Sequence, residues 1–176
     1  IRRVCGSRFA AGVGGPTTLR SQSTSRMVTR MRELQASDLV GMVVGTRWAL
    51  LSCLSFEDRS LAVAEVMLAA NPELWLCLVN EDIEIDVADM RRRAEQAASI
   101  AQVELRFLTS SKRNPIVLAD AMVDISREHV TDDVKWVADV TTMTHEMLLV
   151  AVAAADEIIP AWRDIKFVYN VAERYS

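Results

Sequence analysis

The chain has 176 residues, enough for one domain with a substantial hydrophobic core. Its 51% hydrophobic and 25% charged residues are typical of a globular domain and exclude a disordered or fibrous chain. No apolar run approaches the ~20 residues that a membrane-spanning helix needs, so we expect no membrane segment.

The net charge of −4 hides a basic beginning and an acidic remainder. Residues 1–32 hold seven of the 20 basic residues and no acidic one, which leaves 13 basic against 24 acidic residues in the rest. Because contacts to nucleic-acid phosphates need clustered Lys and Arg side chains, this acidic body argues against a nucleic-acid partner.

The arm at residues 1–36 is rich in Arg, Ser, Gly and Thr and shows weak hydrophobic periodicity. This composition indicates disorder, but it also resembles a transit peptide. A third reading is sequence from upstream of the native start, because the first methionine is Met27. We expect the folded domain to span residues 37–176.

The glycines lie early in the chain, and none follows Gly45. A Walker A loop and a GxGxxG loop both need glycine where the backbone meets phosphate. The later chain therefore uses neither loop, and no cofactor is predicted.

The three cysteines, Cys5, Cys53 and Cys77, form no CxxC pair. The last two lie in apolar runs, so we expect buried free thiols and a cytoplasmic location.

From residue 47 onward, predicted strands alternate with predicted helices. The strands cover 47–55, 74–80, 103–109, 134–141 and 164–170, and the helices cover 60–71, 86–101, 114–129 and 145–159. Asp86 and Asn114 are the expected N-caps of the second and third helices, and Pro115 follows at a first helical position. Strands separated by helices predict right-handed βαβ units and a parallel sheet, a Rossmann-like α/β fold.

The strand patterns also predict the strand order. The first strand is apolar throughout, as a central strand should be, whereas the third alternates as an edge strand would. The order 3-2-1-4-5 fits both. Ligands of such sheets bind beyond the carboxyl ends of the strands where the order reverses, and here residues 55–59 and 139–144 flank that point.

The first candidate segment is Ser55-Phe56-Glu57-Asp58-Arg59. Ser55 and Asp58 have the spacing of a capping-box variant, so the plain reading is that they bind the first amides of the helix. Glu57 and Arg59 are not needed for that cap. Arg59 can bind a phosphate or carboxylate with two parallel hydrogen bonds, or pair with Glu57.

The second candidate segment begins at Asp139, near the end of the fourth strand. A buried carboxylate is rare unless it is paired or functional, and Arg59 is the nearest expected partner. Thr141, Thr142 and Thr144 offer hydroxyls and amides at a helix start, which suits an anion or a sugar, although any one of them can simply cap the helix. The two histidines lack the spacing of a metal site, so no metal is predicted.

The first and fourth helices are apolar almost all round. Glu65 is the single charged residue in 61–70, and residues 147–155 have none. Such helices are normally covered on more than one side. We therefore expect a homo-oligomer or a missing C-terminal segment that covers them.

These segments resemble a largely uncharacterised family of bacterial Rossmann-like proteins. The matching residues are Ser55–Arg59, Asn114-Pro115, 139–146, and Tyr169 with Glu173 and Tyr175. The family usually has Arg where His145 stands. The resemblance covers about residues 47–176 and implies a sensor or effector of bacterial anti-phage defence, with Glu57, Arg59, Asp139 and Glu173 in one pocket.

The leading hypothesis is a site for a nucleotide or nucleotide-like ligand at the strand ends. Arg59 and the threonine amides would hold an anionic group, and Glu57 and Asp139 would bind ribose hydroxyls or act as acid and base. As an enzyme, the protein would hydrolyse a glycosidic bond of a nucleoside or dinucleotide without metal. A protein–protein interaction module without a ligand is the other alternative.

Overall fold

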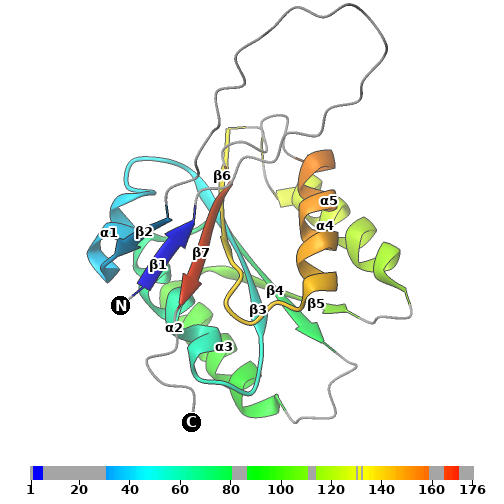
Figure 1. Cartoon of the computed structure of the whole chain (residues 1–176), viewed down its shortest axis with the longest axis horizontal. Coiled ribbons are helices and arrows are strands. Elements are labelled where there is room, and N and C mark those ends of the chain that lie inside the picture. The colour runs from blue at the N-terminus through cyan, green and yellow to red at the C-terminus, as the bar shows by residue number, and fades with distance from the viewer. Residues whose placement is uncertain are drawn as a thin grey trace, which may run out of the picture.

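The structure is a computed structural model that describes residues 2–5, 31–80, 87–110, 114–129, 131, 133–158 and 165–170 (Figure 1). The strands are β1 (Arg2–Cys5), β2 (Met31–Leu34), β3 (Trp48–Leu54), β4 (Leu74–Asn80), β5 (Glu104–Ser110), β6 (Lys135–Asp139) and β7 (Lys166–Asn170). The helices are α1 (Ala36–Gly41), α2 (Arg59–Met67), the 3-10 helix η1 (Leu68–Ala70), α3 (Ala88–Ala101), α4 (Pro115–His129) and α5 (His145–Ile158).

The strands form one seven-stranded sheet in the order β2-β1-β7-β6-β3-β4-β5. Five neighbouring strands, in the spatial order β5-β4-β3-β6-β7, are parallel. This is the order 3-2-1-4-5 that the sequence predicts. β3 lies at the centre of these five strands, and helices cover both of its faces. All seven of its residues are therefore buried.

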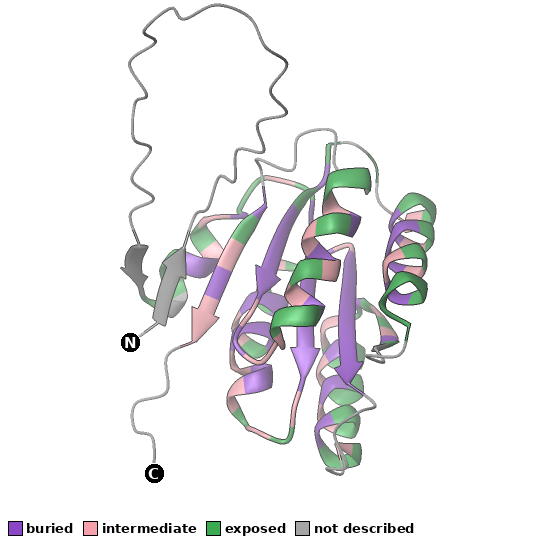
Figure 2. Ribbon diagram, turned by 45° about the vertical axis from the view of Figure 1, so that its right-hand side comes forward, coloured by how far each residue is buried: buried purple, intermediate pink, exposed green. Residues whose placement is uncertain are grey.

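Alternate residues of β3 serve two separate hydrophobic cores. Trp48, Leu50 and Leu54 belong to the core under α1, α2 and α3. Ala49, Leu51 and Cys53 belong to the core under α4 and α5. The helices accordingly lie in two layers, one on each side of the sheet (Figures 1 and 2). This arrangement is the α/β Rossmann-like fold expected from the strand–helix alternation.

Two short strands extend the sheet beyond the predicted domain. β1 pairs antiparallel with β7 on one side and with β2 on the other. Both strands lie within 1–36, the arm whose composition indicated disorder, a transit peptide or sequence from upstream of the native start. Residues 6–30 lie outside the described residues, so the expectation for the arm as a whole stays a prediction.

Most helix boundaries match the sequence pattern, with one correction. α4 begins at Pro115, as the Asn114-Pro115 pair predicts. α3 instead has Val87 at its N-cap, without a side-chain hydrogen bond, and Asp86, the expected cap, lies outside the described residues. α2 continues into η1, which ends at Ala70 and is followed by Asn71 in the left-handed conformation.

The strand order reverses between β3 and β6, which lie side by side in parallel register. Their carboxyl ends lead directly into the segments 55–58 and 140–144. The amino ends of α2 and α5 follow, one on each side of the sheet (Figure 1). The fold therefore brings the two candidate segments to the same edge of the sheet.

Candidate functional site

The turn between β3 and α2 is held by hydrogen bonds other than the expected capping box. The backbone N–H of Glu57 donates to Ser55 Oγ at 3.4 Å, and Ser60 Oγ donates to the Ser55 carbonyl oxygen at 3.3 Å. Asp58 occupies the N-cap position with helical backbone angles and makes no side-chain cap bond. Its carboxylate accepts from Arg93 Nη1 of α3 at 2.6 Å instead. The expected pairing of Ser55 with Asp58 as a capping box is therefore wrong.

Arg59 and Glu57 form the ion pair that the sequence left as one alternative. Arg59 Nε donates to Glu57 Oε2, and Nη2 donates to Oε1 at 3.2 Å. Hydrogen bonding to Glu57 raises the pKa of Arg59, burial opposes that shift, and a side-chain hydrogen-bonding contact with Tyr169 of β7 raises it further. The guanidinium is thus a permanent cation, fixed in orientation by the Glu57 carboxylate.

The third guanidinium nitrogen of Arg59 has no such partner. Nη1 is buried and makes no hydrogen bond with the residues that the structure describes. The whole side chain is only 23% exposed. A buried charged N–H group without an acceptor is costly, which makes Nη1 the unsatisfied donor of this site.

Asp139 and Thr141 connect the ends of β6 and β7. Asp139 is 2% exposed, and its Oδ1 accepts from the backbone N–H of Thr141 at 3.0 Å and from the Thr141 hydroxyl. The same hydroxyl oxygen accepts from the backbone N–H of Asn170 at 2.8 Å. Asp139 and Thr141 therefore have a structural role at the strand ends. The expected ion pair between Asp139 and Arg59 stays a prediction.

The other two threonines are also engaged within the protein. Thr142 Oγ1 donates to the carbonyl oxygen of Cys53, in β3, at 2.7 Å. Thr144 Oγ1 accepts from the backbone N–H of Met147 at 3.3 Å and so caps α5. The plain capping role holds for Thr144. Thr141 and Thr142 thus use their hydroxyls to fix the strand ends, and Thr144 uses its hydroxyl to cap α5.

Two further residues of this edge appear in the sequence motifs but were given no role in the site. Tyr169, one of the residues that match the bacterial family, acts on Arg59 through its side chain. Phe56 is 51% exposed between Ser55 and Glu57. Glu173, predicted to join the pocket, lies outside the described residues.

The buried cysteines are not nucleophiles of this site. Cys53 and Cys77 are buried free thiols, as predicted. Burial raises the pKa of each to about 12. Because the thiolate is the reactive form, neither thiol is activated at neutral pH. Within the described part of the chain, no three His, Cys, Asp or Glu side chains are close enough to hold a metal ion.

No protein-family model matches this chain, and a search of curated proteins finds no match. The resemblance to bacterial defence proteins therefore stays a prediction. Of the helices that the structure describes, none is long and apolar enough to cross a membrane.

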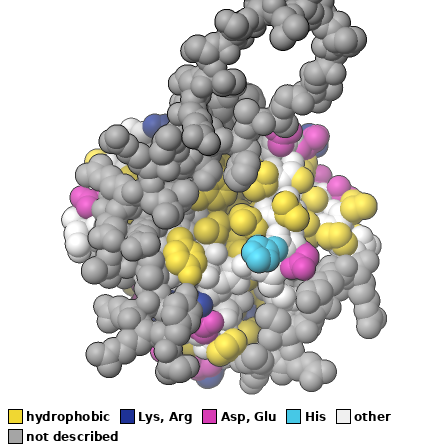
Figure 3. Space-filling view, in the orientation of Figure 1, with side chains coloured by type: hydrophobic (Ala, Val, Ile, Leu, Met, Phe, Trp, Pro, Cys, Tyr) yellow, Lys and Arg dark blue, Asp and Glu magenta, His cyan; other side chains and the backbone are white. Residues whose placement is uncertain are grey.

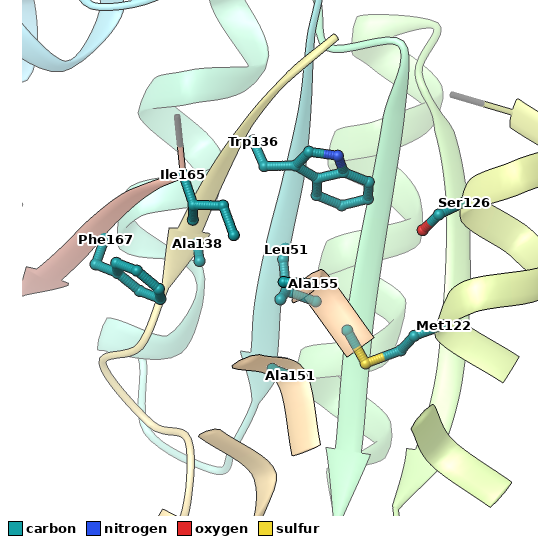
Figure 4. A pocket seen from close by; sticks show the side chains of 9 residues that line it. All are labelled: Leu51, Met122, Ser126, Trp136, Ala138, Ala151, Ala155, Ile165 and Phe167. Atoms are coloured by element: carbon teal, nitrogen blue, oxygen red, sulfur yellow. The ribbon is translucent and has the colours of Figure 1, made fainter. Parts of the chain in front are cut away.

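The face that carries α4 and α5 holds a second feature, which the sequence did not predict. Hydrophobic side chains gather at the centre of this face in the space-filling view (Figure 3). Part of this surface is a groove between α4, α5 and the strands β3, β6 and β7, which we call the α5 groove (Figure 4). It is lined by Leu51, Met122, Ser126, Trp136, Ala138, Ala151, Ala155, Ile165 and Phe167.

Proposed function

We propose that this protein binds a small anionic, nucleotide-like ligand at the carboxyl ends of β3 and β6. The observation that carries the proposal is the buried Nη1 of Arg59, which finds no acceptor among the described residues. A phosphate or carboxylate oxygen of the ligand would supply that acceptor. The site lies where the strand order reverses, the usual ligand position in such sheets.

Glu57 supports this role by positioning Arg59. Both of its carboxylate oxygens accept from the guanidinium, which holds the planar group in one orientation before a ligand arrives. A group fixed in this way loses little side-chain entropy on binding. The same contacts make Glu57 a poor general acid or base, so binding without turnover fits the geometry better than glycosidic hydrolysis.

Phe56 is the neighbour that favours an aromatic, nucleotide-like ligand over a simple anion. Its side chain is 51% exposed and directly precedes Glu57. An exposed aromatic ring in the same turn, three positions before Arg59, offers a flat surface for a base, while the guanidinium binds the phosphate. A role as sensor or effector in bacterial defence would follow from the family resemblance and is part of this proposal.

The test is a thermal-shift titration of the full chain with AMP, ADP, cyclic AMP and NAD. A ligand present at about 100 times its dissociation constant stabilises the folded state by about 2.7 kcal/mol, which is roughly 5–10 °C for a domain of this size. We expect Arg59→Lys to abolish the shift, because the three N–H groups of lysine sit on one nitrogen and lack the planar fork that bonds both Glu57 oxygens while another nitrogen points to the ligand.

Arg106→Lys is the matched control. Arg106 also pairs with the glutamate two positions before it, Glu104, but it lies exposed on the edge strand β5. This variant should keep the full shift. If no nucleotide stabilises the native chain, or if both variants respond alike, the proposed site is wrong.

A second candidate function is protein–protein interaction through α5, and one observation favours it. Leu149 is 71% exposed on that helix. If the protein is an oligomer through this surface, Leu149→Asp should lower its molar mass in light scattering and leave nucleotide binding intact. An unchanged mass would remove this candidate.

A further inference from the structure

We propose that the α5 groove is a second ligand site, for a small apolar molecule that carries one hydrogen-bond acceptor. This inference is independent of the strand-end site, because the two sites use different residues on different parts of the fold. It rests on three observations: a buried hydroxyl without a partner, an apolar lining, and a narrow space open on one side.

The hydroxyl belongs to Ser126 of α4. Its side chain is 0% exposed, and Ser126 Oγ makes no hydrogen bond with any residue that the structure describes. The oxygen points from α4 into the groove, toward the side chains of Met122 and Trp136 (Figure 4). A buried hydroxyl normally finds a partner, so an acceptor that enters the groove would remove an existing cost.

The lining explains why water is a poor occupant. The groove walls around Ser126 are the ring of Trp136 and the apolar side chains of Met122, Ala151 and Ala155. An ordered buried water needs two to four polar partners, and Ser126 is the one hydroxyl of this wall. An apolar group covers such a wall more favourably than water does.

The shape of the groove limits the ligand. Its enclosed volume is about 20 Å³, room for one small group, and the rest of the space is open to solvent. A ligand therefore places only its acceptor in the enclosed part, toward Ser126. Its flat body lies in the open part against Trp136 and Phe167, as the ring of an aromatic ketone would.

Two probes of nearly equal shape test the role of the hydroxyl. Acetophenone carries a carbonyl acceptor, and ethylbenzene does not. Each is titrated into the full chain while the methyl NMR signals of Met122, Ala151 and Ile165 are followed. We expect both to shift these signals saturably, with acetophenone binding about 2- to 10-fold more tightly, the range of one net hydrogen bond.

Three variants locate the site. Ser126→Ala should fold normally, because it removes an unpaired hydroxyl, and it should bind the two probes equally. Ala155→Leu should block the groove to both. The same change at the exposed Ala153 of α5 is the control and should leave both affinities unchanged.

Two results would each overturn a different part of the proposal. An absence of saturable shifts with both probes would overturn the groove as a ligand site. Equal affinity of the native chain for the two probes would overturn the assignment of Ser126 as the donor. Neither result bears on the nucleotide titration, so failure here and failure of the strand-end site are distinguishable.

Discussion

Thr142 Oγ1 donates a hydrogen bond to the carbonyl oxygen of Cys53 at 2.7 Å, across 89 positions of sequence. The contact joins the segment after β6 to the carboxyl half of β3, the two central strands of the sheet. It also defines what the threonines do. The hydroxyls of Thr141 and Thr142 hold the strand ends together, whereas Arg59 presents an unsatisfied donor at the same edge of the sheet.

Removal of the Thr142 hydroxyl should destabilise the protein. Thr142→Val keeps the side-chain shape but loses the hydrogen bond to Cys53. This hydrogen bond is half-buried, and its loss should lower the free energy of unfolding by about 1 kcal/mol. Urea unfolding measures the change. Thr109→Val, at an exposed position of the edge strand β5, should have little effect. Equal losses in the two variants would contradict the assigned role.

Thr141 should be more sensitive, because one hydroxyl makes two contacts. It donates to Asp139 and accepts from the Asn170 backbone N–H. We expect Thr141→Val to cost about 2–3 kcal/mol in urea unfolding, since a buried carboxylate loses a donor and a part-buried amide loses its acceptor. Thr141→Ser keeps the hydroxyl and should retain most of the stability. A serine variant as unstable as the valine variant would show that the methyl group matters instead.

The two core thiols should be protected from alkylation in the folded state. Burial raises the pKa of Cys53 and Cys77 to about 12, from an ordinary value of 9.0. In a Cys5→Ser variant at pH 8.5, iodoacetamide should modify neither thiol until urea unfolds the chain. Rapid modification of the native protein would contradict their burial.

The same shift predicts the pH dependence of stability. The unfolded thiols ionise near 9, whereas the folded ones keep their protons to about 12. Because the folded state then binds more protons, the free energy of unfolding should fall as the pH rises from 9 towards 12. Replacement of both cysteines by alanine should flatten this part of the profile, as measured by urea unfolding at each pH.

An ion-pair cluster at the amino ends of the strands predicts a loss of stability in acid. Arg47 Nη1 donates to Asp133 at 3.0 Å, and its Nη2 donates to Glu73 at 2.8 Å. The pKa of Asp133 is lowered, first by its hydrogen bond with Thr131 and then by Arg47.

The sign of that shift sets the pH window. A lowered folded pKa means that the ionised Asp133 stabilises the fold above its ordinary value of 3.8 and that this contribution is lost as the pH falls below it. The stability difference between the native chain and Asp133→Asn should therefore shrink below pH 3.8. When Arg47→Gln is present in both proteins, the effect of Asp133→Asn on the free energy of unfolding at neutral pH should be smaller. A difference that is the same at every pH would contradict the pairing.

The sequence determined the fold because its signals are local. The uninterrupted apolar run of β3 and the alternation of β5 depend only on how many faces of each strand are buried. These two patterns, with the helices between the strands, were enough for the order of the five parallel strands. Asn114-Pro115 likewise marked the start of α4, because a cap and a proline act on their own backbone.

The partners of polar side chains were decided by tertiary structure. Ser55 and Asp58 have the spacing of a capping box, but α3 brings Arg93 within 2.6 Å of Asp58, and an ion pair forms instead. Thr142 finds Cys53 only because β6 and β3 lie side by side. Ser126 is an unremarkable helix residue in the sequence, and the packing of α4 and α5 on the sheet buries its hydroxyl without an acceptor in the described structure. A hydrogen bond needs two atoms within about 3 Å, and a sequence pattern cannot state which distant atom that is.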